Sequence, residues 1–166
     1  TVGYGAMPQW LRSFREQSPG IALSLREATL DVQLDAFDRG DLDAGFVIHA
    51  PGAVPAGFDA LTISQEPMLL AHAEGLAFGR GASRLARMLA EPLVIFPREI
   101  APSLFDALLG FYRTQGITPQ IAQQAIQMQT IVNLVSAGIG VAWVPQAVCA
   151  LQREGVRYSA VPADVP

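Results

Sequence analysis

The stretch from Gln127 to Pro145 constrains the fold of this chain more than any other part of its sequence. Apolar residues recur at helical spacing in its first half, and a short apolar run closed by Pro145 fills its second half. Gly138 falls where a helix needs a left-handed C-cap, and Gly140 lets the chain reverse without a Cβ clash. The stretch therefore predicts a helix, a tight turn and a buried strand, which together form a unit of an α/β domain.

Helix-like and strand-like patterns alternate over nearly the whole chain. The expected helices cover residues 8–17, 29–39, 83–90, 101–115 and 146–152, with one more beginning at Gln127. The expected strands cover residues 1–4, 21–26, 42–48, 58–64, 67–72, 93–96, 118–124, 141–144 and 156–161. This alternation is typical of βαβ units, so we expect an α/β fold with mostly parallel sheets and a lobe boundary near residues 65–67.

Composition and charge exclude several classes of protein. Hydrophobic residues make up 51% of the chain and charged residues 16%, which indicates a globular domain, and no apolar run approaches the roughly 18 residues of a membrane span. The net charge is −4 and all 11 basic residues are arginines without a basic cluster, so direct binding of nucleic acid is not expected. The chain begins without an initiator Met or a leader, so we expect a segment of a longer protein without a signal peptide.

The chemistry-bearing residues do not form a catalytic or metal-binding motif. No nucleophile elbow, P-loop, zinc-protease motif or dinucleotide fingerprint is present. His49 and His72 are interpreted as surface or loop histidines rather than catalytic ones, and Asp41 and Asp43 as a solvated pair rather than an acid/base couple. Cys149 is the only cysteine, which excludes an internal disulfide and fits a reducing cytoplasm. We therefore predict no enzyme activity, no catalytic residue, no metal and no cofactor.

A ligand site is the better prediction, because small molecules bind α/β sheets outside the carboxyl ends of strands, next to helix N-termini. Thr29 is either a bare N-cap or an N-cap whose hydroxyl also contacts a ligand. His49 follows an expected strand. Arg98 is either a carboxylate clamp, which its planar fork suits, or a solvated loop residue. Gln127 either donates its amide into a cleft or is polar surface.

Several ordered fragments of the sequence resemble the effector-binding domain of LysR-type transcriptional regulators. They are Leu11-x-x-Phe14-Arg-x-x-x-Pro19, Leu34-x-x-x-x-x-Gly40-x-Leu-Asp43-Ala, Pro67-Met-Leu-Leu, Phe111-x-x-x-x-Gly116-Ile-x-Pro119 and Leu134-Val-x-Ala-Gly-x-Gly-Val-Ala-x-Val-Pro145. Their order and spacing are most similar to the branch that controls catabolism of aromatic compounds.

The resemblance implies two Rossmann-like lobes with mainly parallel sheets and a ligand cleft between them, as in type 2 periplasmic binding proteins. Lobe I then covers residues 1–65, lobe II residues 66–161, and residues 162–166 begin a second crossover. Two features of the family are not in this chain, namely a longer loop before the first helix and a C-terminal return to lobe I. The implied contact positions, to which His49 is added, are these: Thr29, Pro97, Arg98, Ser103, Leu104, Gln127 and Met128.

The predicted function is effector sensing. The resemblance implies that a small inducer, carboxylate or aromatic in character, binds between the lobes and that the change is relayed to a winged helix-turn-helix outside this chain. DNA would be contacted only through that missing domain. The resemblance also implies a homo-oligomer, with a dimer of this domain and a tetramer of the full-length protein, in the cytoplasm and not at a membrane. The alternative is a solute-binding protein of a transport system with the same bilobal fold.

Overall fold

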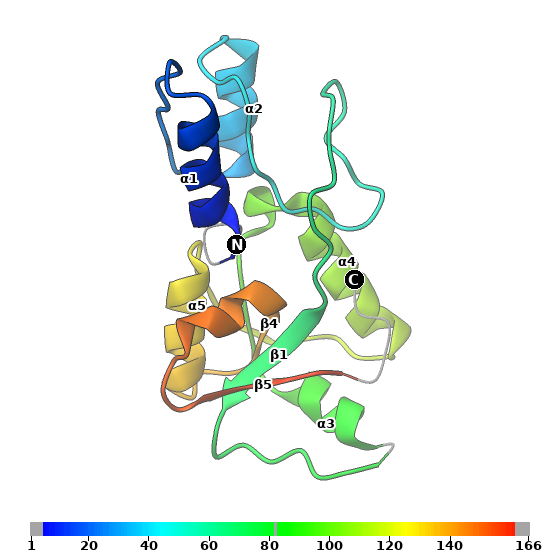
Figure 1. The fold of residues 1–166 in the computed structure, drawn as a ribbon. Coiled ribbons are helices and arrows are strands. Elements are labelled where there is room, and N and C mark those ends of the chain that lie inside the picture. The colour runs from blue at the N-terminus through cyan, green and yellow to red at the C-terminus, as the bar shows by residue number, and fades with distance from the viewer. Residues whose placement is uncertain (1–4, 82, 162–166) are drawn as a thin grey trace.

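The computed structural model describes residues 5–81 and 83–161 (Figure 1). Helices α1 (Met7–Gln17) and α2 (Leu30–Asp38) come first. The other elements follow in the order β1 (Met68–Ala73), α3 (Ser83–Ala90), β2 (Leu93–Ile95), η2 (Arg98–Ile100), α4 (Pro102–Thr114), β3 (Ile121–Gln124), α5 (Met128–Ser136), β4 (Ala142–Pro145), η3 (Gln146–Leu151) and β5 (Val156–Ser159). The strand expected over residues 1–4 and the crossover expected at residues 162–166 lie outside the described residues.

The described strands all lie within residues 66–161, the part predicted as lobe II, and form a three-stranded antiparallel sheet and a two-stranded parallel sheet. Strand β1 pairs antiparallel with β4 on one side and with β5 on the other, while β2 and β3 pair in parallel. A parallel bridge from Leu93 to Val141, the residue before β4, links the two sets. The α/β class is confirmed, but two of these strand pairings are antiparallel rather than parallel. The reason is topological, because β1 brings the chain into the lobe and β5 carries it back in the opposite direction.

Helices α4 and α5 supply most of the apolar surface that closes the core of lobe II. Leu108 and Tyr112 of α4 and Val135 of α5 are fully buried. The Trp143 Nε1 donates a hydrogen bond to the Tyr112 hydroxyl at 3.2 Å, so the indole brings no unpaired donor into the core. Phe111 packs edge-to-face on Trp143, with ring centroids 5.8 Å apart. The two polar groups that the Trp143 and Tyr112 side chains bring into this apolar core are therefore bonded to each other.

The stretch from α5 to β4 folds as predicted, and its two glycines serve different purposes. Gly138 ends α5 with a φ of +76°, and the N–H of Ile139 donates to the Leu134 carbonyl at 3.1 Å. At Gly140, an added Cβ would collide with the backbone carbonyl of Pro92. This close approach lets the Val141 N–H donate to that carbonyl at 2.8 Å. The second glycine thus permits the pairing that joins β4 to β2.

In lobe I the helices form as predicted but the strands do not. The segments 21–26, 42–48 and 58–64 have no regular secondary structure, and no strand is assigned to the described part of lobe I. The amide nitrogen Nε2 of Gln33 donates to the carbonyls of Ala28, at 3.0 Å, and Phe46, at 3.2 Å. One side chain thus occupies carbonyls that a neighbouring strand would use. The strand predictions for these three segments were wrong because alternating apolar residues do not by themselves provide a backbone partner.

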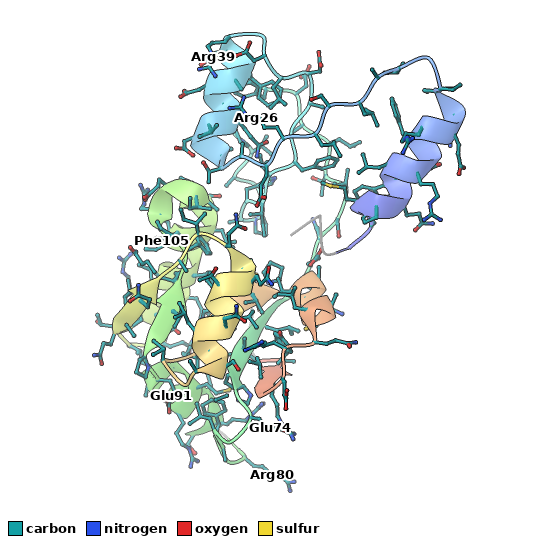
Figure 2. All side chains as sticks on the ribbon, turned by 90° about the vertical axis from the view of Figure 1, so that its left-hand side faces the viewer. Arg26, Arg39, Glu74, Arg80, Glu91 and Phe105 are labelled. Atoms are coloured by element: carbon teal, nitrogen blue, oxygen red, sulfur yellow. The ribbon has the colours of Figure 1, made fainter. Side chains whose placement is uncertain are left out.

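Many apolar side chains of segments 21–26, 42–48 and 58–64 are exposed to solvent. Trp10 of α1 stacks on Phe46 at 6.2 Å, and Phe37 of α2 packs against Phe58 at 5.2 Å. The exposed apolar residues of the segments are Ile21, Leu23, Leu25, Phe46, Val47, Phe58, Leu61 and Ile63. Both views place α1 and α2 at one end of the molecule and the strands at the other (Figures 1 and 2).

Candidate functional site

A half-open pocket of about 260 Å³ lies between the two lobes. Helix α2 of lobe I contacts η2 of lobe II beside it. Figure 2 labels Arg39 at the far end of α2, so the N-terminal end of this helix is the one that faces lobe II. The pocket is mostly apolar, and both lobes contribute to its wall. Its lining residues are Leu30, Leu34, Val47, Ile48, His49, Ala53, Pro55, Ala56, Pro102 and Ser103.

The polar groups of the pocket meet at Ala50, a buried residue of lobe I. The Ala50 N–H donates to the Ser103 Oγ of α4 at 3.2 Å, which is a direct hydrogen bond between the lobes. The His49 Nδ1 lies 2.7 Å from the Ala50 carbonyl oxygen. Since a carbonyl only accepts, the hydrogen is assigned to Nδ1. Two predicted site residues, His49 and Ser103, thus bond to the carbonyl and the N–H of the same residue, Ala50.

Thr29 lies at the N-cap of α2, as the sequence predicts. Its backbone is extended and its carbonyl accepts the Gln33 N–H at 2.9 Å, but its hydroxyl makes no capping bond to the backbone. The hydroxyl bonds instead to the Asp31 carboxylate, which holds the pKa of that carboxyl below its usual value. Thr29 is not among the lining residues of the pocket, and ligand contact by its hydroxyl stays a prediction.

Arg98 makes an intramolecular ion pair at the surface of lobe II. Its Nε and terminal nitrogen donate to the two carboxylate oxygens of Asp106 at 2.8 Å and 2.6 Å. The bidentate bond raises the pKa of Arg98 and lowers the pKa of Asp106. Asp106 lies on α4, one turn after Ser103. A ligand carboxylate would have to compete with Asp106 for this guanidinium, so the clamp stays a prediction.

The start of α5 touches lobe I through one side chain. Gln127, the N-cap residue of α5, donates from its Nε2 to the Glu27 Oε1 at 2.7 Å. Met128 is half-buried and packs against the core of lobe II. Leu104 is 3% exposed and also belongs to that core, which accounts for its burial without a ligand. Pro97 is half-buried at the start of η2.

The sequence predictions missed most of the apolar wall of the pocket. Leu30 and Leu34 of α2 line the pocket, and helical periodicity does not distinguish an apolar residue of a core from one of a pocket. The loop 53–56 carries only alanine, valine and proline, which gave no chemical signal. The one available signal was position, since this Pro/Gly-rich loop follows His49 directly.

The other residues considered for catalysis, His72, Cys149 and Asp41, are buried, half-buried or paired within the protein. His72 is only 5% exposed and bonds to the Ala73 carbonyl and the Ser159 Oγ, both at 3.0 Å, so its interpretation as a surface or loop histidine was wrong. It lies within the buried apolar strand β1, and Phe78 packs against its ring with centroids 4.9 Å apart. Burial raises the pKa of the Cys149 thiol, which lowers its reactivity at neutral pH. Asp41 pairs with Arg39 at 2.9 Å on an exposed surface.

Across residues 5–81 and 83–161, no three His, Cys, Asp or Glu side chains gather as metal ligands would. Within the same residues, every helix is too short or too polar to cross a membrane. The interlobe pocket therefore remains the candidate site in the described part of the chain.

Comparison with known proteins gives a family match over residues 1–166, to the LysR substrate binding domain. The HTH-type transcriptional regulator IlvR of Caulobacter vibrioides is 40% identical over 160 residues, covering 95% of this chain and 53% of IlvR. The HTH-type transcriptional regulator BudR of Raoultella terrigena is 32% identical over 138 residues, covering 82% of this chain and 47% of BudR. The chain thus spans about half the length of these curated relatives.

Solved structures are similar over almost the entire chain. Full-length CbnR in complex with its target DNA has a TM-score of 0.76 at 29% identity, covering 98% of this chain and 56% of CbnR. The BenM effector-binding domain with its effector benzoate has a TM-score of 0.71 at 19% identity, covering 97% of this chain and 73% of that domain. The second likeness is one of fold alone. The relatives are named transcriptional regulators, which favours a regulator over a solute-binding protein of a transport system.

Proposed function

Because the chain belongs to the LysR family as its substrate-binding domain, we propose that it senses a small effector in the pocket between its lobes. The observation that carries the proposal is the pocket itself, whose wall comes from both lobes. A molecule bound there contacts α2 and the 47–56 segment on one side and the start of α4 on the other. Its binding therefore depends on how the two lobes are placed relative to each other.

The proposed effector has a small apolar or aromatic body and a carboxylate or similar polar end. Eight of the ten lining residues are apolar, so burial of the body supplies most of the affinity, at about 25 cal/mol per Å² of apolar surface. Ser103 and His49 provide the polar contacts that orient the ligand. Thr29, Arg98, Gln127 and the neighbouring Pro97, Leu104 and Met128 stay as predicted contributors at or around the site.

The signal in this proposal is a change in the population of lobe arrangements. A ligand shifts such an equilibrium only as far as it binds one arrangement better than the other. A reversal from 1:99 to 99:1 needs a difference of about 5.5 kcal/mol between the two arrangements. Two hydrogen bonds already link the lobes, from Ala50 to Ser103 and from Gln127 to Glu27. Ligand contact at Ser103 changes the surroundings of the first of these bonds directly.

We further propose that the change reaches DNA through a helix-turn-helix outside this chain, in a cytoplasmic homo-oligomer. The support is that IlvR and BudR are named HTH-type regulators about twice the length of this chain, and that CbnR has been solved with its target DNA. We propose a dimer of this domain and a tetramer of the longer protein. Sedimentation that returns only monomer at high concentration would contradict the dimer.

A thermal-shift screen against aromatic and aliphatic carboxylates tests the proposed function. A true effector at about 100 times its dissociation constant stabilises the domain by about 2.7 kcal/mol. Ser103→Ala should weaken the response, whereas Ser64→Ala, an exposed serine of lobe I, should not. Arg98→Ala tests the clamp separately, and an unchanged affinity would remove Arg98 from the site. A screen without any stabilising carboxylate would contradict the proposal.

A further inference from the structure

The hydrogen-bonding capacity of the pocket is small and well defined. The Ser103 Oγ accepts the Ala50 N–H, and no described residue accepts its hydroxyl hydrogen, which is left to donate to a ligand. The His49 Nδ1 is committed to the Ala50 carbonyl, and no described residue bonds to its Nε2. Ser103 and His49 are the only polar side chains among the lining residues. The pocket can therefore satisfy one compact oxygen-bearing group at one place.

The charges around the pocket are unfavourable to a second anionic group. No arginine lines the pocket and the chain contains no lysine. Arg98 is held by Asp106 through both of its donor positions. Asp31 directly follows the lining residue Leu30, and the Thr29 hydroxyl lowers the pKa of its carboxyl, so this carboxylate is ionised at neutral pH. A second carboxylate of this part of lobe I, that of Glu27, accepts a hydrogen bond from the Gln127 amide of lobe II.

From this arrangement we infer that the pocket takes a small molecule with an apolar body and a single oxygen-bearing end, carrying at most one negative charge, and discriminates against dicarboxylates. The inference rests on the proposed function, because it specifies the ligand of the same site. The carboxylate of a monocarboxylate accepts the Ser103 hydroxyl hydrogen, and its body lies against the apolar wall; the His49 Nε2, an acceptor because the ring hydrogen is on Nδ1, suits a hydroxyl group of the ligand. A dicarboxylate of equal length must bury its second carboxylate against that wall without a cation or donor. Burying an unpaired charge carries a large desolvation cost.

The test compares pairs of acids that differ in one carboxylate. Isothermal titration of the 166-residue chain would use hexanoate with adipate and benzoate with terephthalate at neutral pH. Within each pair we expect the monocarboxylate to bind at least about tenfold more tightly. Ala56→Arg places a cation on an exposed lining residue and should raise the affinity for the dicarboxylate at least about fivefold. Ala122→Arg, an exposed position on β3, is the matched control and should change neither affinity.

The outcomes separate this inference from the proposed function. A dicarboxylate that binds as tightly as its monocarboxylate partner, in either pair, would overturn the inference and leave the sensor function standing. An unchanged preference in Ala56→Arg would also count against it, because the missing cation would then not be the cause. If none of the four acids binds, the proposed carboxylate site fails and the inference fails with it.

Discussion

Lobe II closes around side chains such as Leu108, Tyr112 and Val144, which are inaccessible to solvent, whereas Ala36 and Ala50 are the only buried apolar residues in the described part of lobe I. The backbones differ in the same way. In lobe II, β1 is paired along both edges, while in lobe I the Gln33 amide joins Ala28 to Phe46, two residues of irregular segments without a strand ladder.

This difference in burial and backbone hydrogen bonding indicates which wall of the pocket is the more rigid. Segments with few buried apolar contacts and few backbone hydrogen bonds open at a low free-energy cost. Ser103 stands on α4, which is anchored in the core of lobe II, so it offers a rigid contact. Residues 47–56 belong to the loosely held lobe and can adapt to a ligand. Two pairs of substitutions and one single substitution measure this contrast, beginning with the largest expected effect.

Leu108→Ala and Leu61→Ala test the contrast in burial. Leu108 is 0% exposed, and its truncation should lower the free energy of unfolding by about 2–5 kcal/mol. Leu61 is 83% exposed, and the same change there should stay within about 0.5 kcal/mol. Urea unfolding followed by circular dichroism measures both. Equal losses would mean that lobe I has a core that the contacts described above do not account for.

Gly140→Ala and Gly45→Ala test how easily the atoms around an added Cβ can move aside in each lobe. A Cβ at Gly140 meets the Pro92 backbone carbonyl, which cannot move without breaking the β2–β4 bridge, so we expect a loss of about 1–3 kcal/mol. A Cβ at Gly45 meets the end of the Gln33 side chain, which can rotate away at the loss of its hydrogen bonds, about 1 kcal/mol. Urea unfolding of both variants gives these two losses.

A double-mutant cycle supplies the control for the second of these variants. In a Gln33→Ala background, Gly45→Ala should have almost no effect. A full effect of Gly45→Ala in that background would show that the strain comes from the Phe37 ring, whose Cε2 and Cζ lie 3.2 Å and 3.3 Å from the added Cβ, and not from the Gln33 amide.

Tyr112→Phe has the smallest expected effect at neutral pH. It also tests whether the alkaline loss of stability comes from lobe II. The change leaves the buried Trp143 Nε1 without its acceptor, at a cost of about 1 kcal/mol at neutral pH. Burial raises the pKa of Tyr112 to about 12. The folded state therefore keeps the phenol protonated where the unfolded chain, with a pKa of about 10, ionises, and this stability is lost as pH rises from about 10 to 12.

The measurement is unfolding at several alkaline pH values, with Trp143 fluorescence for lobe II and Trp10 fluorescence for lobe I. At pH 11 the wild-type chain should have lost about 1.3 kcal/mol that Tyr112→Phe does not lose. An identical pH dependence in both proteins would contradict the assignment of this alkaline loss to Tyr112.

The sequence predicted lobe II well because its signals were local and agreed with one another. Each element had its own signal in the sequence: the apolar spacing after Ala101, the run Leu93-Val-Ile and the two glycines after α5. The apolar faces that these signals predicted are the ones buried in the core. In lobe I the strand signal at 21–26 was as regular, but a strand also needs a paired neighbour, which alternation does not encode. The site followed the same rule. His49 and Ser103 were found from their positions at element ends, whereas Leu34 was indistinguishable from a core residue.

The hydrogen bond between Glu27 and Gln127 has a consequence for the synthesis of the protein. Its partners are 100 residues apart in the chain, and those of the Ala50–Ser103 bond are 53 apart. At 5–20 residues per second, a ribosome takes about 5–20 s to go from Glu27 to Gln127. Throughout that interval lobe I lacks the lobe II partners of its hydrogen bonds, and its exposed apolar segments are open to chaperones. The lobe I wall of the pocket is thus synthesised well before the lobe II residues that complete it.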